Sequence, residues 1–197
     1  MQAIVDQEGV RRYLVSLTIN GDPQTAMVKA NTVLVNLLRE EYDLTGTKKG
    51  CELGDCGSCT ILLDGRPVNS CLVLALEADG SEIVTVEGLT ERGELDRVQQ
   101  AFLDKAAVQC GYCTPGMILS AKALLDRNPD PTEEEIREAI AGNLCRCTGY
   151  VNIVRAIKAA AGQEASTQES TGRESTGRET SGRETSGEKG KKEQVAS

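Results

Sequence analysis

Hydrophobic and polar residues follow two different periods along the chain, and the change between them comes near residue 90. Before that point, short runs alternate apolar and polar residues, which is typical of strands that bury one face. The alternation predicts strands over residues 13–19, 25–29, 60–63, from 68 onward and 83–86, with turns at 20–23 and 64–65. One helix is expected among them, with Val33, Leu34, Leu37 and Leu38 on its apolar face and Asn31 or Thr32 as its cap. We therefore predict a small mixed sheet crossed by one helix.

After residue 90 the apolar residues recur at helical spacing. Helices are expected over residues 94–107, 115–127, 133–141 and 151–161. Thr114 before Pro115 has the pattern of an N-cap followed by proline at the first helical position, and Thr132 with Glu135 fits a capping box. Four short helices joined by brief loops predict an antiparallel bundle, with the domain boundary near residues 88–93.

The two ends of the chain differ in character from these halves. From about residue 163 the sequence becomes a five-residue polar repeat, first complete at residues 170–174. Such a segment cannot bury enough apolar surface to offset its ordering entropy, so we predict a disordered tail over 163–197. A passive tail is the simpler interpretation, and a tether for a partner is the alternative. Residues 1–11 are expected to form an N-terminal extension.

The composition restricts the chemistry of the protein to sulfur. The chain has 197 residues with eight cysteines and no histidine, which excludes catalytic triads, His-liganded zinc or haem, and Rieske clusters. Its formal net charge of -8 opposes the phosphate neutralisation that nucleic-acid binding requires, so no nucleic-acid partner is expected. The sequence has neither an apolar run of membrane-span length nor a signal-peptide pattern at its start, and we expect a cytoplasmic protein.

The first four cysteines, Cys51, Cys56, Cys59 and Cys71, have the spacing of plant-type ferredoxins, which hold a [2Fe-2S] cluster. Glycines interleaved with them allow the backbone to wrap closely and to direct its N–H groups inward. These amide dipoles, with the nearby Lys48 and Lys49, are expected to stabilise the negative charge of a cluster. The spacing of this set is a strong signal.

The other four cysteines, Cys110, Cys113, Cys145 and Cys147, lie at the junctions of predicted helices. Cys113 comes just before the helix expected at residue 115, where free amides and the helix dipole favour the thiolate. Taken alone, this second set is a weak signal for a metal site. It gains weight from the first set.

Two other interpretations of the eight cysteines stay open. Disulfides suit small secreted chains, but the missing signal peptide argues for a reducing compartment. Two zinc sites of four cysteines each are the second alternative. Structural zinc sites usually combine two short knuckles, whereas the first set has the arrangement of a ferredoxin.

Three runs of the sequence, taken together, resemble a known family. Residues 49–60, 109–116 and 143–150 read KGCELGDCGSCT, QCGYCTPG and NLCRCTGY. They are similar to the iron–sulfur subunit of the molybdenum hydroxylases, the relatives of xanthine dehydrogenase, aldehyde oxidoreductase and carbon monoxide dehydrogenase. The resemblance covers residues 12–161, and the ordered pair of cysteine motifs makes it specific.

The resemblance implies an α+β fold of two domains, each with one [2Fe-2S] cluster. Residues 12–88 would form a β-grasp, ferredoxin-like domain, and residues 89–162 an all-α domain built as a four-helix bundle. By the same resemblance, Cys51, Cys56, Cys59 and Cys71 ligate one cluster and Cys110, Cys113, Cys145 and Cys147 the other.

The family also implies a division of labour with partner subunits. The cluster of the helical domain sits nearer the molybdopterin cofactor of a large subunit, and the ferredoxin-like cluster passes electrons to FAD, usually on a medium subunit, or to an external acceptor. Gln109 and the region of Cys147 would approach the pterin. Cys147 would then be both a ligand and part of the electron path.

The residues themselves suggest no site for substrate chemistry. The acids at residues 133–135 are better explained as helix-start charges than as an acid–base pair. We therefore expect an electron-transfer subunit of a molybdenum hydroxylase, with a free-standing two-cluster carrier or a zinc-stabilised interaction module as alternatives. Tyr112 and Met117 are expected to be buried either against the large subunit or in the core of this chain.

Overall fold

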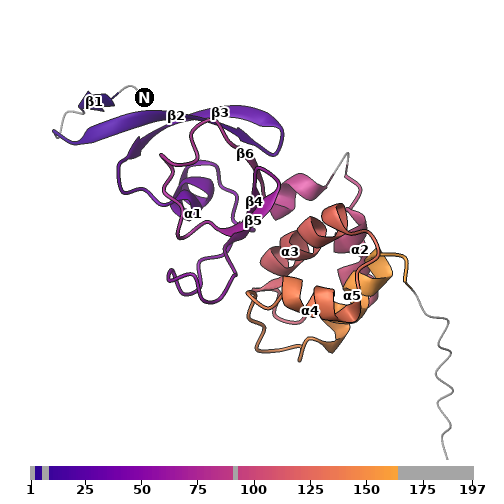
Figure 1. Ribbon diagram of the computed structural model, residues 1–197. Helices are drawn as coiled ribbons and strands as arrows, with labels where there is room; N and C mark the ends of the chain where they lie inside the picture. Colours follow the sequence, from indigo (N-terminus) through magenta and orange to yellow (C-terminus); the bar gives the residue numbers. More distant parts are fainter. Residues whose placement is uncertain (1–2, 6–8, 91–92, 164–197) are drawn as a thin grey trace, which may run out of the picture. The chain divides into compact units, whose positions relative to one another are not determined.

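The computed structural model describes residues 3–5, 9–90 and 93–163, which form a mixed helix-and-sheet fold (Figure 1). The tail expected beyond residue 163 lies outside the described residues. The strands are β1 (Ala3–Val5), β2 (Arg11–Ile19), β3 (Asp22–Lys29), β4 (Thr60–Leu63), β5 (Arg66–Asn69) and β6 (Glu82–Val84). The helices are α1 (Leu34–Asn36), the π-helical turn η1 (Leu37–Glu41), the 3-10 turn η2 (Val86–Leu89), α2 (Arg97–Asp104), α3 (Thr114–Arg127), α4 (Glu133–Ala139) and α5 (Val151–Ala160).

All six strands belong to one sheet, in which β1, β2, β6, β4 and β5 are neighbours in that order and β3 pairs with the other side of β2. The β2–β6 pair is parallel, and the other pairs are antiparallel. β1 pairs with the start of β2, so part of the expected N-terminal extension contributes a strand to the sheet.

The β2–β3 hairpin is tighter than the sequence suggested. Ile19 lies opposite Asp22, so only Asn20 and Gly21 form the turn, with φ of 52° and 86°. Two such residues build the primed turn that matches the twist of a hairpin. The predicted turn at 20–23 was therefore too long. Pro23 lies in β3, which among the described strands pairs with β2 alone. Such an edge strand tolerates proline because its outer side has no strand partner there for the missing N–H.

The helix of the first half begins without the predicted cap. Its N-cap is Val33, which makes no side-chain capping bond, and Thr32 Oγ1 instead accepts a hydrogen bond from Lys29 N at 3.1 Å. The prediction of Asn31 or Thr32 as the cap was wrong. Val33, which was also expected on the apolar face, lies before the helix and is only partly buried. The prediction was correct for Leu34, Leu37 and Leu38, which are all buried. They join the core beneath the sheet with, among others, Val15, Leu17, Ile61 and Ile83.

Side-chain caps define two of the helix starts in the second half. Asp96 and Gln99 form a capping box that starts α2 three residues after the predicted position, and Thr132 with Glu135 forms the predicted capping box of α4. α3 differs from the prediction, because its N-cap is Cys113 and Thr114 is its first residue. Pro115 occupies the first turn, where its missing N–H costs nothing.

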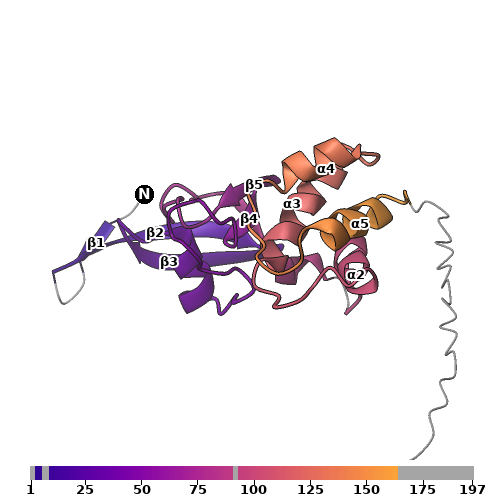
Figure 2. The same ribbon diagram turned by 90° about the horizontal axis from the view of Figure 1, so that it is seen from below.

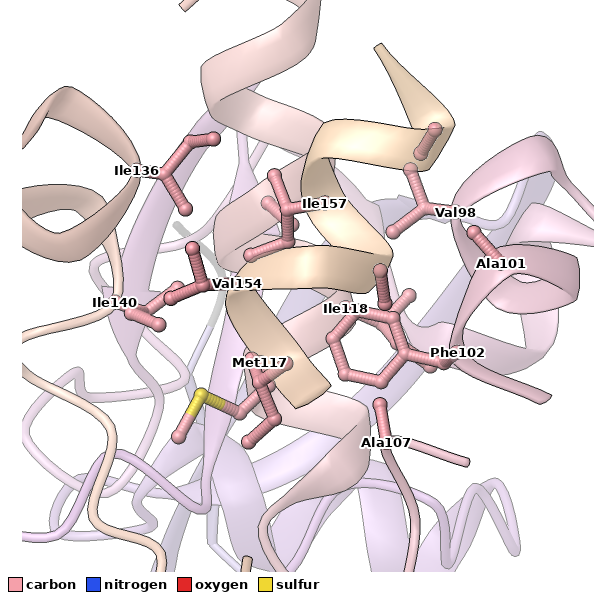
Figure 3. Packing of buried hydrophobic residues seen from close by; sticks show 14 of the residues in the cluster. Val98, Ala101, Phe102, Ala107, Met117, Ile118, Ile136, Ile140, Val154 and Ile157 are labelled. Carbon is pink, nitrogen blue, oxygen red and sulfur yellow. The ribbon is translucent and has the colours of Figure 1, made fainter. Parts of the chain in front are cut away.

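Helices α2, α3, α4 and α5 pack around one apolar core, shown closely in Figure 3. Phe102 of α2 and Met117 of α3 are at most 1% exposed in it, with Val154 and Ile157 contributed by α5 (Figure 3). Leu119 and Ala123 lie on another face of α3 and form a small cluster with Leu62 of β4, which joins the helices to the sheet. Figure 2 shows α3 beside this end of the sheet. None of the helices in the described ranges has the length and hydrophobicity of a membrane span.

Candidate metal centres

The first set of cysteines is gathered by the long loop after η1 and by the segment after β5. Cys51, Cys56 and Cys59 lie in the loop that leads into β4, and Cys71 follows β5. Cys59 and Cys71 are buried, whereas Cys51 and Cys56 are partly exposed. The β4–β5 hairpin therefore brings the remote fourth cysteine back to the other three.

Backbone amides point at a thiol in this loop, as the sequence predicted. Leu53 N and Cys56 N donate to Cys51 Sγ at 3.3 and 3.4 Å. These bonds, that from Leu53 first, lower the pKa of Cys51 to about 7 because they stabilise the thiolate. Cys56 Sγ lies 3.2 Å from Ser58 Oγ, which adds a hydroxyl beside the same group of sulfurs.

Cys59 and Cys71 face each other on the buried side of the loop. Burial, followed by the hydrogen bond with the neighbouring Cys59 thiol, raises the pKa of Cys71 to about 11. Ser70 Oγ donates to the Cys59 carbonyl at 2.7 Å, and Val35 packs against both cysteines. These contacts hold Cys59 of the loop and Cys71 of the segment after β5 together, next to α1.

The residues directly before Cys51 place two lysines and a glycine beside the loop. Lys48 Nζ donates to the Thr45 carbonyl at 2.7 Å, and Lys49 forms an ion pair with Glu52 at 3.4 Å, so both predicted cations lie beside the loop. The backbone at Gly50 lies close to the Cys56 thiol, because a Cβ added there would be 2.7 Å from Cys56 Sγ. Only glycine leaves this side of the cysteines open.

The second set of cysteines lies between helices. Cys110 and Cys113 come before α3, and Cys145 and Cys147 lie between α4 and α5. Cys113 is buried and Cys145 partly exposed, whereas Cys110 and Cys147 are both exposed and their sulfurs are 3.5 Å apart. Two loops that are more than 30 residues apart in the sequence thus meet at their cysteines.

The thiols of this set differ in their acidity. Burial, followed by the hydrogen bond with Cys145, raises the pKa of Cys113 to about 12. The expected helix-start effect on Cys113 was therefore wrong for the free thiol, since desolvation outweighs the nearby amides. Burial also acts to raise the pKa of Cys145, but hydrogen bonds from the Thr148 hydroxyl and amide lower it below the ordinary value. The hydrogen bond with Cys110 raises the pKa of Cys147.

The donor chemistry of both sets suits iron–sulfur clusters. All eight cysteines are free thiols, and their mutual interactions join Cys71 to Cys59 and Cys51 in one set and Cys113 to Cys145 and Cys110 in the other. In the part of the chain that the structure describes, no three Cys, Asp or Glu side chains are grouped as around a single metal ion. Four cysteine thiolates are the ligand set of a [2Fe-2S] cluster, and hydrogen bonds to the sulfurs tune its potential.

Three other predicted residues are located by the structure. Gln109 is exposed beside Cys110. Tyr112 is 47% exposed and its hydroxyl donates to the Lys49 carbonyl, so it bridges the loops of the two cysteine sets. Met117 is fully buried in the helical core, which makes the core interpretation of Met117 correct and leaves it no contact surface for a partner.

Four polar residues near the cysteines were not predicted as parts of the site. Asn143 is 3% exposed and reaches across to the first loop, while Tyr150 OH accepts from Cys145 N at 2.8 Å and donates to the Asn143 carbonyl at 3.1 Å. Ser58 and Thr148 lie beside Cys56 and Cys145. The sequence could have indicated these residues, because all four lie within or next to the cysteine motifs. The local sequence does not reveal which hydrogen-bond partner each side chain has in the fold.

Comparison with known proteins gives the same division into two halves. A sequence model for a [2Fe-2S] binding domain matches residues 85–158, and one for a 2Fe-2S iron-sulfur cluster binding domain matches residues 17–89. The chain is therefore composed of two [2Fe-2S] binding domains in tandem.

Proteins with high identity include subunits of several oxidoreductases. The nicotinate dehydrogenase small FeS subunit of Eubacterium barkeri is 52% identical over 151 residues, which cover 77% of this chain and 96% of that subunit. The nicotine 6-hydroxylase small subunit of Paenarthrobacter nicotinovorans is 51% identical over 152 residues, or 77% of this chain and 92% of that subunit. In the crystal structure of quinoline 2-oxidoreductase from Pseudomonas putida 86, one chain aligns with a TM-score of 0.74 and 50% identity, covering 77% of this chain and 94% of that one. The protein belongs to the small iron–sulfur subunits of the molybdenum hydroxylase family, the electron-transfer subunits of these enzyme complexes.

Proposed function

We propose that this subunit conducts electrons from a molybdopterin site on a large subunit, first through the helical half and then through the sheet half, to FAD on a medium subunit or to an external acceptor. The hydroxylation at the large subunit converts R–H and water into R–OH, two protons and two electrons. A [2Fe-2S] cluster takes up and releases one electron at a time. The observation that supports the proposal is that the interactions between thiols stay within two separate sets, one in each half of the chain.

The proposed ligands follow from that grouping. Cys51, Cys56, Cys59 and Cys71 would hold one cluster, and Cys110, Cys113, Cys145 and Cys147 the other. The first set would belong to a β-grasp domain over residues 12–88, and the second to a four-helix-bundle domain over residues 89–162. The carbonyl of Cys56 accepts a hydrogen bond from Leu144 N at 2.9 Å, and Leu144 directly precedes Cys145. This bond connects a proposed ligand residue of one set to the neighbour of a proposed ligand in the other.

The exposure of the cysteines supports an orientation for the chain. Cys110 and Cys147 are the exposed thiols, and Gln109 lies exposed beside them. A glutamine amide both donates and accepts hydrogen bonds, as recognition of a pterin edge requires. We therefore assign this surface to the large subunit, with Gln109 and Cys147 against the pterin.

We assign the loop of the first set to the side of the chain that faces the electron acceptor. Leu53 and Leu72 are 72% and 60% exposed, and both lie within two residues of a proposed ligand. An exposed apolar pair beside acidic Glu52 and Asp55 has the character of an interface centre with a polar rim. This surface suits the flavin-binding subunit or another acceptor. The free thiols fit a reducing compartment, which supports a cytoplasmic location.

Analysis of the purified complex tests the proposal. We expect about four irons and four acid-labile sulfides per chain, a visible spectrum that bleaches on reduction, and co-purification of a large molybdenum-containing subunit. A colourless, zinc-loaded protein would contradict the electron-transfer assignment. Full iron and sulfide without any partner would instead indicate a free-standing carrier.

A further inference from the structure

The two halves of the molecule meet at the side chain of Asn143, which is 3% exposed. Asn143 Nδ2 donates to the Gly57 carbonyl at 2.9 Å and to Thr60 Oγ1 at 3.0 Å. Asn143 Oδ1 accepts from Ser120 Oγ of α3 at 2.7 Å. A buried amide with partners on both its nitrogen and its oxygen holds three segments in one geometry.

The backbones around this amide approach too closely for any side chain to intervene. A Cβ at Gly57 would lie 2.2 Å from the Gly142 carbonyl oxygen, and a Cβ at Gly116 would lie 2.5 Å from the Gly57 carbonyl oxygen. Gly57 also has a φ of +65°, which favours glycine. The first cysteine loop, the start of α3 and the second cysteine loop therefore contact one another directly through their backbones.

Each segment that Asn143 contacts adjoins proposed ligands. Gly57 lies directly after Cys56 and two residues before Cys59, and Asn143 itself lies two residues before Cys145. On the other side, the Asn143 carbonyl accepts from Tyr150 OH, which in turn accepts from Cys145 N. A displacement of Asn143 would therefore reach the ligands of both sets.

The chemistry of the site requires an amide. The hydroxyl of Ser120 already donates to one end of the side chain, while the Gly57 carbonyl can only accept at the other end. A carboxylate lacks the donor, and an aliphatic side chain lacks both groups. Losing the amide would remove the acceptor of the Ser120 hydroxyl and one donor to the Gly57 carbonyl, which keeps its hydrogen bonds from Thr60 N and Thr60 Oγ1. The junction would then open or shift so that the buried Ser120 hydroxyl finds another partner.

We propose that Asn143 is a positioning residue that sets the separation and orientation of the two cluster sites and so governs electron transfer between them. This inference rests on the ligand sets proposed above. Functional groups have to be held to within about 0.5 Å of their working geometry, and the buried junction supplies that constraint. Asn143 then acts through the two cysteine loops and contacts neither the substrate nor a redox group itself.

Pulsed EPR on the fully reduced, purified complex tests the inference by measuring the magnetic interaction between the two clusters. The variants are Asn143→Ala, the milder Thr60→Val, and Asn152→Ala as a matched control. Asn152 Nδ2 donates to the Ala106 carbonyl at 3.3 Å within the helical half, away from the junction. Iron and sulfide content is measured on every sample.

We expect Asn143→Ala to retain both clusters while the interspin distance shifts or its distribution broadens, and electron equilibration between the clusters to slow. Thr60→Val should change in the same direction by less, and Asn152→Ala should match the wild type. Full iron with an unchanged interspin distribution in Asn143→Ala would overturn the inference. If Asn143→Ala does not load iron, Thr60→Val decides: a distribution equal to that of the wild type overturns the inference. Absence of iron from the wild-type chain would instead overturn the ligand sets.

Discussion

The two cysteine sets differ most in how far they are open to their surroundings. In the first set two of the four thiols are buried and none is fully exposed, whereas the second set has two exposed thiols, Cys110 and Cys147. The first set is enclosed by a loop that folds back on itself and on a sheet. The second is formed where two loops between helices meet, which leaves one side uncovered.

The sets are nevertheless alike in their internal chemistry. Each contains one thiol whose pKa is lowered by hydrogen-bond donors, Cys51 and Cys145, and one whose pKa is raised by burial, Cys71 and Cys113. Although their backbones differ, each set thus has one thiol with a lowered pKa and one whose pKa is raised by burial. The clearest difference between the two sets is therefore the exposure of their thiols.

The largest expected effect comes from substituting one cysteine, which should remove the cluster of one set and leave the cluster of the other set intact. We expect Cys56→Ser to remove one EPR signal of the reduced protein and about half of the iron, and Cys113→Ser to remove the other signal, because each set is proposed to hold its own cluster. EPR with iron analysis of both variants makes the measurement. If either substitution abolished both signals, the two sites would not be independent.

A second prediction concerns the contact between the sets. Gly57→Ala adds a Cβ that would lie 2.2 Å from a backbone oxygen, at a φ of +65°. We expect at least about 3 kcal/mol of destabilisation in urea unfolding, because the added Cβ would clash with a backbone atom and not with the end of a flexible side chain. Gly80→Ala is the matched control: φ there is +84° and the added Cβ meets nothing within 4 Å, so the cost should be about 1 kcal/mol. Equal costs at the two positions would mean that the junction yields easily.

The smallest expected effect is on the pH dependence of stability, from a glutamate on the surface of the helical half. Hydrogen bonds from Lys158 and then Arg137 lower the pKa of Glu133 to about 2, from an ordinary value of 4.5. A lowered pKa means that the stabilisation is present above pH 4.5 and is lost as the pH falls through about 2. Glu133→Gln should therefore flatten the pH dependence of stability between these values, with only a small effect at pH 7. Thermal unfolding against pH measures this, with Glu134→Gln as the control; identical curves for the two variants would show that the ion pairs contribute nothing.

Much of the fold was predictable because its signals are local. The alternation of apolar residues predicted the β2–β3 and β4–β5 hairpins, and the capping box of Thr132 and Glu135 marked the start of α4. The errors were local too. At the start of α1 the threonine side chain accepts from the preceding Lys29 and leaves the helix uncapped, and before α3 it is Cys113 that has the N-cap position.

The sequence alone determined that the chain has two groups of four cysteines, one per half, because residue spacing constrains which thiols a short loop can bring together. Only the tertiary structure decided which thiols are exposed and that Asn143 joins the first loop to the second. Asn143 and Gly57 are 86 residues apart, and a hydrogen bond at that separation leaves no periodic or local trace in the sequence. It exists because the packing of α3 on β4 brings together backbones that only glycine allows to touch.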